Sequence, residues 1–178
     1  MPGRLDAKKV YAQTKEIAEA MGSPSDLRVM PVGKDGLSHL LYLNSLVADE
    51  TIAWVTDHFT TLGTLPVADP ELPVRGRVYP LADPGAAVEM ILAGNFVLVN
   101  DGMMAVEAHG WVKREPQEPE TERLIRGPRE GLTETLEDNI GLVRRWIRDP
   151  NLRVEELRVG RRTKTRIALL YLADVAQL

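Results

Sequence analysis

The sequence predicts an α/β protein made of αββ units, in which mixed or antiparallel sheets are covered by packed helices. Three observations support this class. Stretches with apolar residues at helical spacing alternate with pairs of short apolar runs. A glycine-containing turn separates the two runs of each pair, which is typical of a β-hairpin. One helix–hairpin pattern occurs twice, so we expect one complete lobe followed by part of a second, similar lobe.

Composition limits the possible functions. The chain has 178 residues and is 44% apolar, which is enough to bury a core without cross-links. It has no cysteine, which excludes disulfides, thiolate metal sites and a cysteine nucleophile and is compatible with a reducing, cytoplasmic setting. Charged residues near the N-terminus argue against a signal peptide, and no run reaches the roughly 18 apolar residues of a membrane span.

Charge is unevenly distributed along the chain. Residues 1–122 hold 10 Lys/Arg against 18 Asp/Glu, a net charge of −8, whereas residues 123–166 hold 12 against 7, a net charge of +5. This asymmetry indicates polar contacts with a partner at the basic end. Nucleic acid is not the expected partner, because the basic stretch lacks interleaved aromatic residues and the whole chain carries −4.

Two helices are predicted in the first third of the chain. Residues 6–21 form the first, with Asp6 as its N-cap and Gly22-Ser23-Pro24 at its end. Its inward face is expected to carry Val10, Tyr11, Thr14, Ile17, Ala18 and Met21. Asp49 is expected to cap the second helix, which stops at Gly63. The apolar residues of the second helix are Ile52, Val55, Phe59 and Leu62.

Two hairpins are predicted in the first lobe. They pair residues 27–32 with 37–43 and residues 96–99 with 103–108. Lys34-Asp35-Gly36 turns the first hairpin. Asn100-Asp101-Gly102 turns the second and is expected to supply a positive φ.

A proline-rich loop separates the second helix from the second hairpin, and a short edge strand is expected in it at 74–79. Asp83 and Pro84 then predict the N-cap and first residue of a third helix, which ends at Gly94. Its inward residues are Ala87, Val88, Ile91 and Leu92. The acidic, proline-rich segment 115–122 is predicted to be an exposed link.

The most informative stretch joins a stiff arginine turn to an amphipathic helix predicted over 132–148. Glycine and proline exclude regular structure from Arg126-Gly127-Pro128-Arg129-Glu130. The apolar stripe of the helix is Leu132, Leu136, Ile140, Val143 and Ile147. Charges suit the helix dipole. They are Glu134, Glu137 and Asp138 at the start and Arg144, Arg145 and Arg148 at the end.

The sequence also repeats itself. Asp26-Leu27-Arg28-Val29 and Leu40-Leu41-Tyr42-Leu43 resemble Asn151-Leu152-Arg153-Val154 and Leu169-Leu170-Tyr171-Leu172. The later copy predicts a hairpin of 152–159 with 165–172. We infer an internal duplication, with coincidence between apolar strands as the alternative. If the duplication is real, the next helix of the second copy should begin at Leu178, so we expect a fragment cut inside its second lobe.

The expected divisions follow from these patterns. Residues 1–114 form the first α/β lobe, residues 115–131 form the connector and the arginine turn, and residues 132–178 start the second lobe.

No catalytic, metal or cofactor site is predicted. His39, His58 and His109 lie in separate elements without metal-ligand spacing, so each is expected to be a surface or half-buried residue. Glu155 and Glu156 are neighbours on a strand and point to opposite faces, which is wrong for a shared acid/base site. No phosphate-binding glycine motif occurs.

Several residues allow more than one interpretation. Arg126 and Arg129 could pair with carboxylates, contact another subunit or bind an anion, and pairing is favoured because acidic residues compete for the same place. Asn139 either bonds to a loop backbone or is simply exposed. The tryptophans are expected in the core or at a lobe interface; they are Trp54, Trp111 and Trp146.

Three segments resemble a known family. DPGAAVEMILAGNFVLVNDG at 83–102, the stretch 118–152 and VGRRTKTRIALLYLADVA at 159–176 are similar to the N-terminal soluble domain of spore nutrient germinant receptor A subunits. These subunits form the GerA family, which includes a related stage V sporulation membrane protein. The motif positions are Arg126, Gly127, Pro128, Arg129, Glu130, Thr133, Glu134, Asn139, Arg144 and Arg145. Leu132 and Trp146 depart from the pattern, where the family usually has Phe and a basic residue.

The resemblance implies two α/β lobes that precede a membrane-embedded portion, so that the chain meets the membrane only through segments it does not contain. The full-length protein would lie in the spore inner membrane, with this domain facing the cytoplasm or spore core. Implied partners are other A subunits, in a ligand-gated channel, and the B and C subunits. The implied ligand of such a receptor is an amino acid or a sugar.

On this basis we expect a non-enzymatic domain for receptor assembly and signal relay. The arginine turn and the helix after it would form a rigid joint between lobes or subunits. The alternative is a sensor domain that binds a nutrient or an ion directly.

Overall fold

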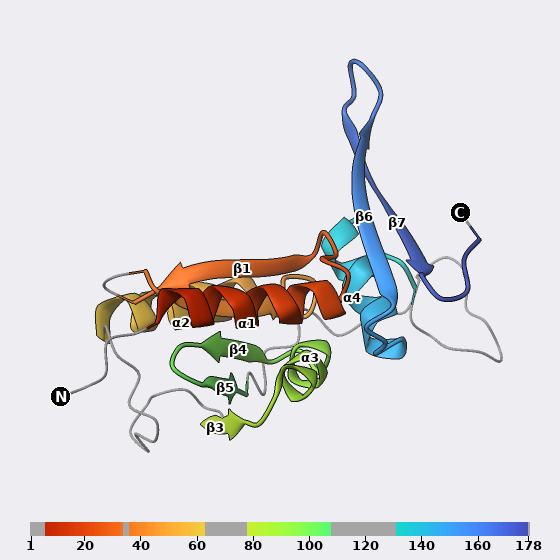
Figure 1. The fold of residues 1–178 in the computed structure, drawn as a ribbon. Coiled ribbons are helices and arrows are strands. Elements are labelled where there is room, and N and C mark those ends of the chain that lie inside the picture. The colour runs from red at the N-terminus through yellow and green to blue at the C-terminus, as the bar shows by residue number, and fades with distance from the viewer. Residues whose placement is uncertain (1–5, 34–35, 63–77, 108–130, 178) are drawn as a thin grey trace.

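The computed structural model describes residues 6–33, 36–62, 78–107 and 131–177 (Figure 1). Its helices are α1 (Ala7–Ala20), α2 (Asp49–Leu62), α3 (Pro84–Leu92) and α4 (Leu136–Trp146). Its strands are β1 (Leu27–Val32), β2 (Ser38–Leu43), β3 (Val78–Leu81), β4 (Phe96–Val99), β5 (Met103–Val106), β6 (Leu152–Val159) and β7 (Thr165–Leu172). All strand pairs in the described ranges are antiparallel, and helices pack on the larger sheet, which confirms the predicted α/β class.

Five strands form the main sheet, in the order β1-β2-β4-β5-β3. The edge strands β1 and β3 hold Pro31 and Pro80, which lack an N–H and are tolerated where a strand has a free side. The edge strand expected at 74–79 therefore exists, although it is described only from Val78 to Leu81. Residues 74–77 lie outside the described part of the chain.

Helices cover both faces of this sheet. α1 and α3 lie on one face, over a core of aliphatic and methionine side chains that includes Ile17, Leu41 and Ile91. α2 lies on the other face, where Val55 and Phe59 pack with their neighbours from the sheet. The result is a three-layer arrangement, which we call the five-stranded unit (residues 6–107).

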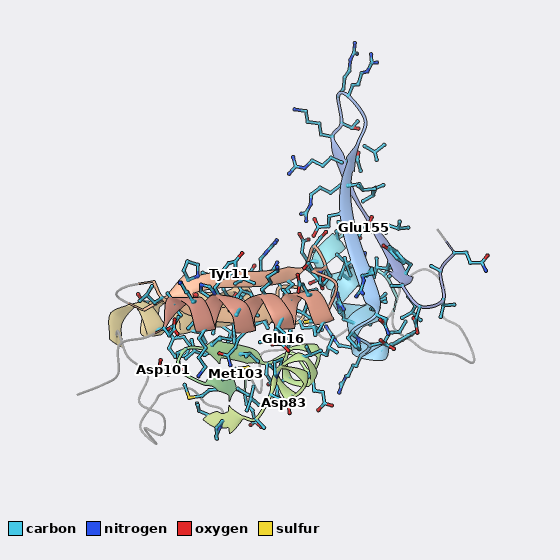
Figure 2. All side chains as sticks on the ribbon, in the orientation of Figure 1. Tyr11, Glu16, Asp83, Asp101, Met103 and Glu155 are labelled. Carbon is cyan, nitrogen blue, oxygen red and sulfur yellow. The ribbon has the colours of Figure 1, made fainter. Side chains whose placement is uncertain are left out.

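The predicted N-caps Asp6 and Asp83 are confirmed, whereas the predicted cap Asp49 and the predicted core residue Tyr11 are corrected. The carboxylate of Asp6 accepts bonds from the amides of Lys8 and Lys9, and that of Asp83 caps α3. Asp49, however, is the first residue of α2, because the Ala48 carbonyl accepts the first helical bond. Tyr11 is 65% exposed, so it does not belong to the core face of α1. Figure 2 labels Tyr11 on this helix.

The second hairpin forms as predicted, but its turn works differently. Gly102 does not have the expected positive φ, and neither does Asn100 or Asp101. Instead the Gly102 amide donates to the Asn100 side chain at 3.0 Å, and the Asn100 amide donates to the Gly102 carbonyl. The Asn100 side chain takes the place of a backbone acceptor in this turn, so the turn does not need the positive φ that glycine can adopt.

The repeated sequence has a repeated structure. Leu27 pairs with Leu43 and Arg28 with Tyr42, and the later hairpin places Leu152 against Leu172 and Arg153 against Tyr171. Equivalent loop bonds also recur, from Asn44 to the Asp26 carbonyl and from Ala173 to the Asn151 carbonyl. The helix–hairpin pattern is thus duplicated down to its hydrogen bonds. We call α4, β6 and β7 the hairpin unit; its two strands project away from the five-stranded unit (Figure 1).

Candidate functional site: a buried joint

The two units meet at a cluster of polar contacts that we call the joint. The five-stranded unit contributes Met21, Ser25, Asp26 and Ser45. The hairpin unit contributes Gly141, Arg144, Arg153, Val154 and Glu156.

An ion pair between Asp26 and Arg144 lies at the centre of the joint. Nε of Arg144 donates to Oδ2 of Asp26 at 2.9 Å, and its terminal nitrogen donates to Oδ1 at 2.8 Å. The hydroxyl of Ser45 donates to the same Oδ2 at 2.7 Å. The two charged side chains are only 3% and 1% exposed. Planar, bidentate pairing compensates the desolvation of both charges, and loss of either partner would leave the other buried and unpaired.

Gly141 lets α4 approach the five-stranded unit closely. A Cβ added at this position would overlap the Ser45 carbonyl oxygen. Gly141 stands three residues before Arg144 and so lies on the same side of the helix. A larger residue would hold α4 away and stretch the bonds between Arg144 and Asp26.

Backbone contacts extend the joint onto β6. The Ser25 amide donates to the Val154 carbonyl at 2.8 Å, and the Glu156 amide donates to the Ser25 hydroxyl at 3.1 Å. The Arg153 guanidinium donates to the Met21 carbonyl at the end of α1. Helix ends leave such carbonyls without partners, so a cation satisfies this one well.

Asn139 fixes the loop before α4. Its carbonyl oxygen accepts from the Thr133 amide at 2.7 Å, and its amide donates to the Thr133 carbonyl at 2.8 Å. Of the two interpretations of Asn139, bonding to a loop backbone is the observed one. The clamp also explains why the helix predicted over 132–148 is shorter: its cap is Thr135, and Leu132 is 75% exposed in the loop.

The predicted arginine turn lies outside the described residues: Arg126, Gly127, Pro128, Arg129 and Glu130. Glu134 is exposed, and Arg145 is half-buried in the last turn of α4.

Trp146 and Ile147 correct two expectations about burial. Trp146 is 60% exposed, so it is not a core residue. Ile147, expected in the apolar stripe, is 36% exposed because α4 ends at Trp146. Trp111 and the side chain of Trp54 lie outside the described part of the structure.

The described histidine and carboxylate side chains do not form a metal-binding group. His39 is half-buried, its Nδ1 lies 2.9 Å from the Thr14 hydroxyl, and burial lowers its pKa. His109 and the side chain of His58 are not described. No group of three or more His, Asp or Glu in the described ranges could hold a metal ion.

No helix within the described ranges is long and apolar enough to cross a membrane.

Sequence reasoning found Arg144 but not its partners. Asp26 is distinctive in the sequence only as part of the repeat, and Ser45 is not distinctive. Gly141 offered a usable signal, because a glycine inside an amphipathic helix usually has a packing reason. The pairing itself had no such signal, since Asp26 and Arg144 are 118 positions apart.

The fold and the joint define a class of α/β protein in which a sheet unit and a helix–hairpin unit are held together by a buried ion pair. The chain belongs to the GerA family: the family of the Bacillus/Clostridium GerA spore germination protein matches residues 15–178. This match confirms the resemblance found in the sequence.

Individual relatives agree. The chain is 33% identical to spore germination protein KA of Bacillus subtilis over 95% of its own length and 33% of that protein. It is 32% identical to spore germination protein GerLA of Bacillus cereus, over 93% of this chain and 36% of the relative. The chain thus spans about a third of the length of these relatives.

A solved structure has the same fold. It is the N-terminal domain of the A subunit of the Bacillus megaterium spore germinant receptor GerK3. The TM-score is 0.62 at 21% identity, over 92% of this chain and 64% of that one.

Proposed function

We propose that this chain acts without catalysis, as the N-terminal domain of a spore nutrient germinant receptor A subunit, and that its joint relays conformational change. The full-length protein would lie in the spore inner membrane with this domain on the cytoplasmic side. It would assemble with other A subunits and with B and C subunits. Membership of the GerA family supports the receptor role. The buried pair of Asp26 and Arg144 is the observation that supports the relay.

A buried ion pair resists displacement of one partner from the other. Each partner is buried, so a partly separated pair would keep its desolvation cost and lose its attraction. Small movements of the hairpin unit should therefore carry the five-stranded unit along with it. Coupling of this kind between packed units is what a relay requires.

The test uses the full-length receptor in spores. Arg144→Ala should abolish or strongly slow nutrient-triggered germination, measured as loss of optical density, while the receptor still accumulates. Arg148→Ala is the matched control, because Arg148 is an exposed arginine just past the same helix. Normal germination with Arg144→Ala would contradict the relay. The arginine turn is tested in the same assay by charge reversal of Arg129, which should also abolish germination.

A nutrient or ion sensor is the second candidate, and one feature favours it. A surface hollow of about 530 Å³ lies between α2 and the first two strands. Its lining is Met30, Tyr42, Asn44, Asp49, Ile52, Ala53, Thr56 and Asp57. Burial raises the pKa of Tyr42, Arg28 opposes that shift and Asp49 adds to it. A thermal-shift screen with amino acids and sugars separates the candidates, since a ligand that binds the native state raises its Tm.

A further inference from the structure

Both copies of the repeat contribute to the joint, so its residues have equivalents in the other copy. The Arg28 guanidinium donates to the Ser25 carbonyl, three positions earlier in the chain. The Arg153 guanidinium donates in the same way to the Pro150 carbonyl, so Pro150 is the equivalent of Ser25. A hairpin unit could meet the five-stranded unit of another molecule through such equivalent residues, with Pro150 against β1. We call that contact the second joint.

The two backbone bonds of the joint cannot form in the second joint. The Ser25 amide donates to the Val154 carbonyl on β6. Its equivalent Pro150 has no N–H to donate to β1. The Glu156 amide donates to the Ser25 hydroxyl. Its equivalent on β1 is Pro31, because both residues stand four positions after the start of their strand. Proline therefore replaces the backbone donor at both positions.

The helices differ at the positions that matter most to the joint. Counting back from the C-cap of each helix, Ala18 of α1 stands where α4 has Arg144. Lys15 stands where α4 has Gly141. α1 thus lacks the arginine that crosses the joint and the glycine that lets the helix approach closely. A lysine at this position would hold α1 away from the other unit.

The acceptor groups have changed as well. The equivalent loop bonds make Asn151 the counterpart of Asp26 and Asp174 the counterpart of Ser45. A neutral amide therefore stands in place of the buried carboxylate. Asp174 would face Lys15 in the second joint, but an exposed ion pair strengthens a contact by only about fivefold or less. That gain does not replace a buried bidentate pair and two backbone bonds.

We propose that Pro31 and Pro150 confine the joint to one use, between the two units of a single molecule. Two different surfaces meet in the joint, and a contact of this kind that also formed between molecules would build an open chain of them. β1 is an edge strand, which is where a loop of another molecule could bond. The prolines remove those bonds and leave the joint itself intact. The inference concerns contacts between copies and does not rest on the relay.

The test gives the second joint the residues of the first. A copied variant carries six substitutions: Lys15→Gly, Ala18→Arg, Pro31→Glu, Pro150→Ser, Asn151→Asp and Asp174→Ser. It should form multimers in sedimentation velocity beyond any that the wild-type chain forms. Returning only positions 31 and 150 to proline should weaken this association at least about fivefold, because two hydrogen bonds are lost. A copied variant that has the wild-type circular dichroism but no added association would overturn the proposal, and so would association that the prolines do not weaken.

Cysteine reporters identify the contact and do not need the copied variant to fold. Lys15→Cys and Asp174→Cys occupy the positions equivalent to Gly141 and Ser45, which touch in the joint. The chain has no cysteine of its own, so every disulfide comes from the introduced residues. With both prolines present, this pair should cross-link molecules no faster than the control pair Lys8→Cys and Asp174→Cys. Faster cross-linking there would mean that the second joint forms despite the prolines.

The same reporters measure what the prolines contribute. Adding Pro31→Glu with Pro150→Ser should speed cross-linking at least about fivefold, because both bonds of the second joint can then form. Pro80→Glu with Pro84→Ser is the matched control, since it makes the same changes on β3 and α3, outside the joint. Equal rates in the two backgrounds would overturn the proposal. None of these results bears on the relay, which germination of the Arg144 variant tests.

Discussion

Gly141 lies against the carbonyl oxygen of Ser45 with no room for a methyl group between them. We predict that Gly141→Ala destabilises the protein by about 1–2 kcal/mol. Alanine favours an α-helix by about 1 kcal/mol over glycine, but overpacking at a tight contact costs about 1–3 kcal/mol. Urea unfolding measures the difference. Gly102→Ala is the control, because a Cβ there meets nothing within 4 Å and the φ is not positive. Equal effects of the two substitutions would mean that α4 does not need the close approach.

The buried ion pair predicts a non-additive pair of substitutions. Arg144→Ala or Asp26→Ala alone should cost about 3–5 kcal/mol, because each leaves an unpaired buried charge. Asp26→Leu combined with Arg144→Met should cost less than the two corresponding single changes together, since no charge is stranded. Denaturant unfolding of the double-mutant cycle gives the coupling energy. Additive effects would show that the pair is not desolvated in solution.

The loop clamp predicts a local effect. Asn139→Ala removes both bonds to Thr133 and should expose its amide, so that the amide exchanges hydrogen faster. Asn139→Asp keeps the acceptor oxygen and should retain more protection. Glu134→Ala, in the same loop, is the control and should leave exchange at Thr133 unchanged. Protection that survives Asn139→Ala would assign it to another contact.

His39 predicts a pH dependence. Burial lowers its pKa below the ordinary value of 6.5, so the unfolded chain binds the proton more readily. The contribution of His39 to stability is therefore complete above about pH 6.5 and is lost as pH falls below it. Unfolding at pH 7.5 and 5.5 measures this loss, and His39→Gln should reduce it. An unchanged loss in the variant would place the titration elsewhere.

Local chemistry made much of the described fold predictable. Asp6 and Asp83 stand where caps are needed, and each is followed by a helix with an apolar face. The hairpin strands were predictable because apolar runs flank turn residues. The position of the second turn was also predicted correctly, although the Asn100 side chain closes it and a positive φ does not. The shortened α4 was not predictable from periodicity, because the Asn139 clamp competes with the helix for the Thr133 backbone.

The joint was predictable only in part. Arg144 could be singled out as a motif position on the helix expected at an interface, but neither the motif nor the helix dipole identifies the group with which it pairs. The structure buries Arg144 because Gly141 brings the helix against Ser45 and places Asp26 within reach. Such a pairing depends on tertiary geometry that no local pattern contains. The hairpin repeat, by contrast, was visible in the sequence because duplicated strands keep their register.

The separation of Asp26 and Arg144 by 118 positions also orders events during synthesis. A chain emerges from the ribosome N-terminus first, so the sheet and its helices can be complete while Arg144 is still untranslated. During that interval the Asp26 carboxylate stays hydrated at the surface. Asp26 becomes buried only after α4 has been synthesised and Arg144 has paired with it.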